Sequence, residues 1–122
     1  MSLDILNREK VLAAFKHEMQ RAVIAKKNVD FEDAFHHYER AHILSQKYTW
    51  PHMKSHLGML HIGYLRKDAR EVFGQCVRVV AAMFFSKIWV PIGNTGGANV
   101  SALKPMPIPE DLKPLLAPWT PE

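Results

Sequence analysis

The chain has 122 residues, 48% of them hydrophobic and 23% charged, which is enough to build one folded domain with a modest core. Its net charge of +4 comes from 16 basic and 12 acidic residues that are interspersed, so we expect no nucleic-acid partner. A single cysteine excludes an intramolecular disulfide and suits a reducing compartment. We therefore expect residues 1–122 to form one cytoplasmic domain.

The first two predicted helices span about residues 4–27 and 30–46. In the first, Phe15, Met19 and Ala22 belong to an apolar stripe with three- and four-residue steps, and Asn28 is the expected stop. Asp30 is a good cap for the second helix, because its side-chain oxygen can accept a hydrogen bond from the first turn.

The third and fourth predicted helices span about residues 51–66 and 68–89. Pro51 suits the first turn of the third helix, and Asp68, with Glu71 three residues later, suits the start of the fourth. Cys76 falls among the expected inner positions of the fourth helix, so a buried, inert thiol is predicted. The full set of inner positions is Val72, Phe73, Cys76, Val79, Val80 and Met83.

The most apolar run, residues 77–92, contains two basic residues and a proline, so no membrane-spanning helix is expected. Residues 91–122 form a proline-rich tail that still carries Leu112, Leu115, Leu116 and Trp119. A disordered tail would not need such apolar side chains. We expect this tail to pack across the helices in extended, polyproline-like form, with one or two helical turns over residues 109–116.

Two predicted helices share a small–aromatic–small pattern at an offset of 35 residues. The pattern is Ala34, Tyr38 and Ala41 in one helix and Ala69, Phe73 and Cys76 in the other. It resembles the second helix of a tetratricopeptide repeat, which implies an all-α fold of two stacked helical hairpins. An ordinary antiparallel four-helix arrangement is the alternative.

A repeat stack of this kind predicts an interaction module with a concave groove for a peptide or a partner helix, lined by the first and third helices. Two repeats would leave an apolar end face, which the tail or a homodimer could cover.

Three segments resemble a bacterial family known only as a domain of unknown function. They are YERAHILSQ at 38–46, HMKSHLGML at 52–60 and GNTGGANVSALKPMPIP at 93–109. This resemblance implies no activity, so it leaves the functional alternatives open.

Histidines carry the main chemical signal. His52 and His56 share a helix face, and a hairpin centred near residue 48 sets His42 opposite residues 54–56. Three imidazoles suit zinc, copper or nickel, and Glu39, one turn before His42, is a candidate fourth ligand or hydrogen-bond partner. The sequence thus offers a metal sensor, buffer or minor metalloenzyme as the alternative function. Ordinary packed histidines, each with one bonded nitrogen, are the competing interpretation.

No catalytic residue is assigned, because no serine or cysteine is evidently paired with a histidine, and a non-enzyme is favoured. Asn94, Thr95 and Gly96 lie in a glycine-rich segment whose N–H groups could bind a ligand phosphate. The segment lacks the lysine of a P-loop and follows a helix, so a tight turn with positive φ is the preferred interpretation.

Overall fold

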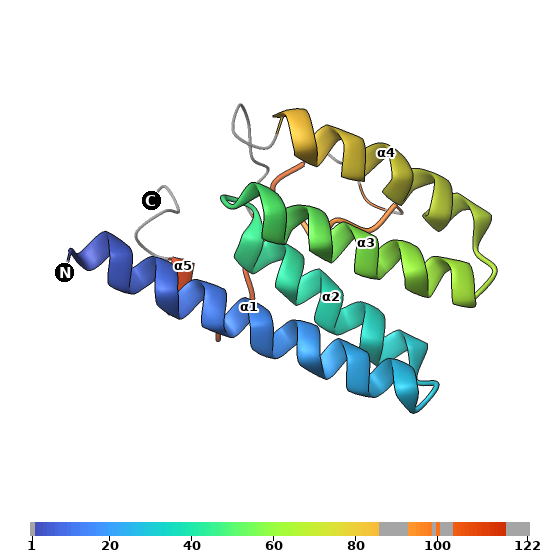
Figure 1. The fold of residues 1–122 in the computed structure, drawn as a ribbon, viewed down its shortest axis with the longest axis horizontal. Coiled ribbons are helices and arrows are strands. Elements are labelled where there is room, and N and C mark those ends of the chain that lie inside the picture. The colour runs from blue at the N-terminus through green and yellow to red at the C-terminus, as the bar shows by residue number, and fades with distance from the viewer. Residues whose placement is uncertain (1, 86–92, 99, 101–103, 117–122) are drawn as a thin grey trace.

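The computed structural model describes residues 2–85, 93–98, 100 and 104–116. Its helices are α1 (Leu3–Lys27), α2 (Phe31–Ser45), α3 (Thr49–Leu65), α4 (Ala69–Phe85) and the short α5 (Lys113–Leu116) (Figure 1). These residues contain helices and turns but no strand, so the predicted all-α fold is confirmed. None of the helices described is both long and apolar enough to span a bilayer.

The four long helices pack in chain order, α1 on α2, α2 on α3 and α3 on α4 (Figure 1). The side-chain oxygen of Asp30 caps α2 by accepting a hydrogen bond from the Asp33 N–H (3.1 Å). Asp68 does the same for α4 through the Glu71 N–H (3.0 Å). Both caps were predicted from the sequence, since an aspartate there satisfies an N–H group that the helix leaves free.

Two apolar clusters form the core, and α1 and α2 contribute to both. One lies between α1, α2 and α3 and the other between α1, α2 and the tail. The first consists of Ala22, Ala25, Ala34, Tyr38, Met59 and Ile62. The second consists of Val11, Phe15, Ala41, Ile43, Leu44, Leu112 and Leu116. In the described residues, α4 contributes to neither cluster.

The α4 helix corrects a prediction from the sequence. Phe73 is 73% exposed, and Cys76, Val80 and Met83 are exposed as well, so the expected inner face is wrong. The inward side of α4 instead carries polar side chains that bind the tail and the histidines, as described below. Phe73 and Cys76 therefore do not pack as their sequence counterparts Tyr38 and Ala41 do, and the proposed repeat does not extend to the packing of α4.

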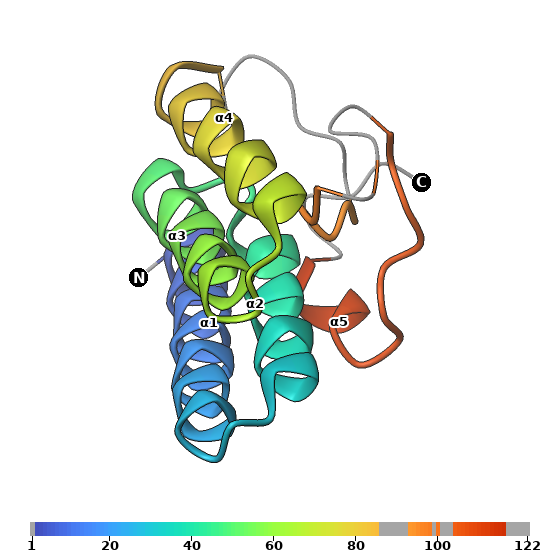
Figure 2. The ribbon, with the colours of Figure 1, turned by 90° about the vertical axis from the view of Figure 1, so that its right-hand side faces the viewer.

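The later part of the tail packs into the core. Leu112 and Leu116 are buried against α1 and α2, beside the single described turn of helix over residues 113–116. Figure 2 shows the described part of the tail, in orange to red, running along one side of the helices. Residues 91–92, 99, 101–103 and 117–122, and the expected end of the fourth helix at 89, lie outside the described part. The extended, polyproline-like form of the whole tail therefore stays a prediction.

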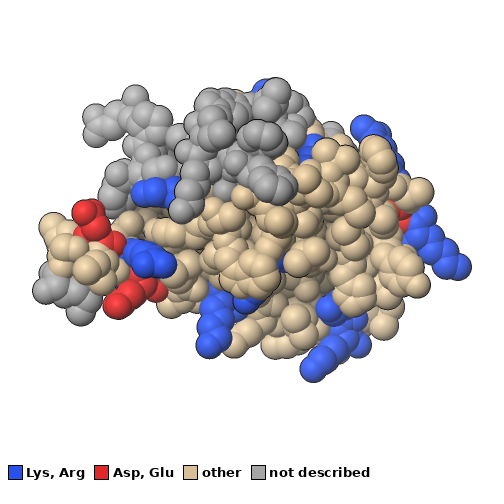
Figure 3. Space-filling model, turned by 45° about the horizontal axis from the view of Figure 1, so that its top comes forward, with Lys and Arg blue, Asp and Glu red and all other residues tan. Residues whose placement is uncertain are grey.

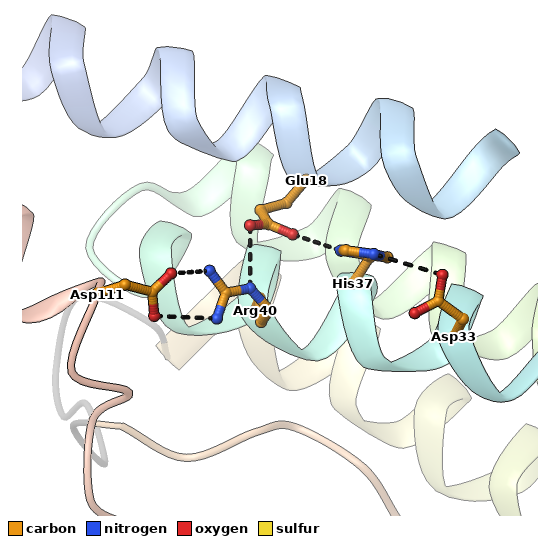
Figure 4. A network of polar contacts seen from close by, with 5 residues as sticks. All are labelled: Glu18, Asp33, His37, Arg40 and Asp111. Atoms are coloured by element: carbon orange, nitrogen blue, oxygen red, sulfur yellow. Dashed lines mark hydrogen bonds and ion pairs between the residues drawn. The ribbon is translucent and has the colours of Figure 1, made fainter. Parts of the chain in front are cut away.

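A polar network joins α1, α2 and the tail (Figure 4). The Arg40 guanidinium donates to Glu18 Oε1 through Nε (3.0 Å) and to both Asp111 carboxylate oxygens (3.2 and 2.5 Å). The other Glu18 oxygen lies 2.6 Å from His37 Nδ1, and His37 Nε2 lies 3.5 Å from Asp33 Oδ2. Glu18 is buried, so Arg40 compensates a carboxylate that is largely shielded from water.

We expect Arg40→Met to lower the free energy of unfolding by about 3 kcal/mol, because it leaves the buried Glu18 carboxylate without its arginine partner. The matched variant Asp111→Asn removes only an exposed partner of the same arginine, and its cost should stay below about 1 kcal/mol. Urea unfolding measures both values. Equal midpoints for Arg40→Met and the unmodified protein would contradict this account of the network.

Candidate metal centre

Three histidines meet at the end of the molecule where α2 turns into α3. His42 lies in the last turn of α2, His52 in the first turn of α3 and His56 one turn later. His52 Nε2 lies 2.9 Å from His42 Nε2 and 3.2 Å from His56 Nε2. No ring is more than 9% exposed. The structure therefore brings together the three residues that the sequence singled out as metal ligands.

The close approach of α2 and α3 depends on Gly58. A Cβ atom at this position would lie 2.7 Å from Cζ of Tyr38, a contact that real side chains do not make. The missing side chain lets α3 lie directly against the Tyr38 ring. The two helices are thus close enough for imidazoles on both to touch.

Two of the rings are oriented through their outer nitrogens. His42 Nδ1 lies 2.7 Å from the backbone oxygen of Asn94, which can only accept, so this nitrogen carries the proton and donates it. His56 Nδ1 lies 2.6 Å from Gln75 Oε1. Because the Gln75 amide nitrogen donates to Glu71 and Gly96, its oxygen faces His56 as an acceptor. In the neutral rings, Nε2 of both His42 and His56 therefore presents a lone pair to the centre.

The third ring cannot satisfy both lone pairs. A neutral His52 has one ring proton and can donate it from Nε2 to only one of the other two Nε2 atoms. The remaining lone pair then faces another nitrogen without a proton between them. Among the described residues, the buried Nδ1 of His52 has no hydrogen-bond partner either. A cation at the centre would accept all three lone pairs at once.

A segment of the tail closes over the histidines; residues 93–98 are called the glycine strap below. Gly96 has φ of +84°, and a Cβ there would lie 2.6 Å from the His42 ring. Only glycine combines this backbone conformation with so close an approach to the imidazole. The positive φ that the sequence favoured for this segment is observed at Gly93 and Gly96.

The polar face of α4 holds the strap in place. Gln75 and Arg78 both donate to the Gly96 oxygen at 2.7 Å, and Arg78 also donates to the oxygens of Gly97 and Val100. The Glu71 carboxylate accepts from the Ala98 N–H at 3.1 and 3.2 Å. The apolar periodicity of α4 did not predict this function, although Glu71, Gln75 and Arg78 recur at four- and three-residue steps and form a polar stripe.

The remaining predicted site residues lie around the cluster and are not part of the three-histidine group. Asn94 Oδ1 accepts from the Gly96 N–H (2.9 Å), so this N–H is engaged within the strap. Glu39 is hydrogen-bonded to Thr95, and burial raises the pKa of its carboxyl group. The potential metal-binding group in the described residues consists of His42, His52 and His56 without Glu39.

Burial keeps the three imidazoles neutral. It lowers the pKa of His52 to about 4 and, with a smaller repulsion from His52, lowers the pKa of His56 to about 3. The pKa of His42 lies well below its usual range, first because of burial and then because of repulsion from His56 and His52. Neutral imidazole is the form that binds a metal ion.

The sequence profile of a family described as "Protein of unknown function (DUF3703)" matches residues 9–116. The chain belongs to the DUF3703 family. The matched part of this DUF3703 chain contains all three histidines, the polar face of α4 and the glycine strap. No curated protein and no solved structure matches the chain. The resemblance of its helices to tetratricopeptide repeats therefore stays a prediction.

The metal-free DUF3703 protein should lose stability as the pH falls from about 6.5 to about 4. In this range the unfolded histidines take up protons at a pKa of about 6.5, while the buried ones in the folded state do not. Three such groups give a slope of about 4 kcal/mol per pH unit near pH 5. Urea unfolding between pH 4.5 and 7.5 measures this slope.

The variant His56→Gln should reduce the slope by about a third, whereas the exposed His61→Ala should leave it unchanged. A slope that is the same in His56→Gln as in the unmodified protein would mean that His56 is not buried in its neutral form.

Proposed function

We propose that this protein binds one transition-metal ion, of the zinc, copper and nickel class, through the Nε2 atoms of His42, His52 and His56. The convergence of three buried Nε2 atoms, with the protons of two rings held on the outside, carries the proposal. A tetrahedral ion with metal–nitrogen distances of 2.0–2.1 Å holds its nitrogens about 3.3 Å apart. The observed separations of 2.9 and 3.2 Å need only a small expansion to reach this value.

The hydrogen bonds around the cluster support the same function. Metal-bound histidines usually donate their other ring N–H to a carbonyl or carboxylate oxygen, which fixes the tautomer and the ring orientation. Asn94 and Gln75 supply such oxygens to His42 and His56. Ordinary packed histidines need one bonded nitrogen each, but they do not need their other nitrogens to meet at one point.

The burial of the site favours a sensor or a buffer over an enzyme. All three histidines are buried and the glycine strap covers His42, so a large substrate has no direct access to the centre in this conformation. A bare ion is small enough to need only a local opening of the strap.

The tag-free protein should bind about one equivalent of Zn(II), and His42→Ala, His52→Ala and His56→Ala should each weaken binding at least about 100-fold, because each removes one of three ligands. Equilibrium dialysis followed by elemental analysis measures the bound metal. His61→Ala is the matched control, since it removes an exposed histidine from α3. The proposal fails if the unmodified protein takes up no zinc, copper or nickel, or if the three variants bind as it does.

A second candidate function is an interaction module, although its surface would not be the groove along the first and third helices that the sequence predicted but the outer face of α4. Large apolar side chains are exposed there, and this face is defined by Phe73, Val77, Val80 and Met83. Figure 3 turns the side of α4 toward the viewer, and a broad part of the described surface carries no charged side chain. Exposed apolar patches of this kind mark protein–protein contacts, and a homodimer is the simplest such contact.

If the α4 face forms a homodimer, light scattering should give a mass above that of the monomer, and Val77→Asp should restore the monomer because it places a charge in the interface. Val29→Asp is the control, since Val29 is exposed in the turn between α1 and α2. A monomer at every concentration tested would contradict self-association through this face.

A further inference from the structure

We propose that Arg78 makes this site selective for a monovalent ion, so that Cu(I) binds in preference to divalent zinc or nickel. The inference rests on the proposed function, because it concerns the same three histidines. It adds the charge of the preferred ion and names the residue that selects it.

The ligands themselves favour a monovalent ion. The described residues bring three neutral nitrogens together, and no carboxylate or thiolate joins them within ligand distance. Zinc in proteins is almost always four-coordinate, so here it would need a further ligand from solvent. Cu(I) is stable with three ligands, and three imidazoles complete its coordination without a counter-charge.

A guanidinium group lies just outside the ligands. Arg78 is half-buried and donates to the Gly96 oxygen, which also accepts from the Gln75 amide that holds His56. Gly96 in turn lies against the ring of His42. Hydrogen bonds thus fix the positive charge of Arg78 on Gly96, the strap residue that lies against His42 and accepts from the Gln75 amide.

The nearby carboxylates are bonded to groups other than the ligands. Glu71 accepts from the Gln75 amide and from the Ala98 N–H, and it interacts electrostatically with Arg78. Glu39 is bonded to Thr95. Neither carboxylate is among the ligands, so the field of Arg78 acts on an ion that has no anionic ligand.

Charge selectivity follows from Coulomb's law. Repulsion by a fixed positive charge is proportional to the charge of the bound ion, so Arg78 opposes a divalent ion twice as strongly as a monovalent one. Removing this charge should strengthen the binding of Zn(II) more than that of Cu(I). A change in the strap alone would affect both ions to a similar degree.

The experiment compares Arg78→Gln with Arg78→Lys in the full chain. Arg78→Gln removes the charge, whereas Arg78→Lys keeps it while losing the planar guanidinium that contacts three carbonyls. The affinities for Zn(II) and, under anaerobic conditions, for Cu(I) are measured by competition with a chromogenic chelator of each ion. The unmodified protein should bind Cu(I) more tightly than Zn(II). Arg78→Gln should shift the ratio of the two affinities toward zinc by roughly tenfold, and Arg78→Lys should keep the ratio of the unmodified protein.

The outcomes separate this inference from the proposed function. Any of three results would overturn selectivity by charge while leaving the metal site intact. The ratio of the two affinities is unchanged in Arg78→Gln, the ratio shifts equally in both variants, or the unmodified protein binds Zn(II) more tightly than Cu(I). Absence of binding by the unmodified protein would overturn both. A general loosening of the strap in either variant would weaken the binding of both ions to a similar degree. It would leave the ratio of the two affinities unchanged, so it cannot produce the expected shift.

Discussion

The chemistry of this protein depends on where two imidazole protons are held. The Asn94 backbone oxygen and the Gln75 side-chain oxygen keep the protons of His42 and His56 on Nδ1, so both rings turn an Nε2 lone pair inward. His52 lies between these lone pairs with one proton to share. Without the two outer acceptors, the same three rings could exchange tautomers and satisfy one another. With them, the centre is short of protons and suited to a cation.

The arrangement explains why α4 has its polar side chains inside. Glu71, Gln75 and Arg78 form the contacts that hold the glycine strap against the histidines, and they must face the interior to do so. Since the helix has a polar inward side, its apolar residues are left on the outside. The exposed apolar face of α4 is thus a consequence of the contacts that hold the strap.

The tail belongs to the site as well as to the core. One part of it supplies the strap, and another supplies Leu112 and Leu116 to the cluster between α1 and α2. The Arg40 network adds a polar connection from Asp111 to the buried Glu18. The position of the strap therefore depends on side chains that lie far apart in the sequence. These are the polar residues of α4 that bind the strap and the residues that attach the later part of the tail to α1 and α2.

The sequence by itself determined the four long helices, the aspartate caps of two of them and the group of histidines. Local signals carry these features: Asp30 and Asp68 act within one turn, and the spacing of His52 and His56 puts both on one face. Antiparallel pairing across a short turn was enough to add His42. Only the tertiary structure decided which face of α4 is buried, that the strap covers His42 and that Glu39 binds Thr95. These features depend on contacts between segments that are 18 to 56 residues apart in the sequence. Hydrophobic periodicity predicts which apolar face is buried, but it does not identify a polar face that is buried through hydrogen bonds.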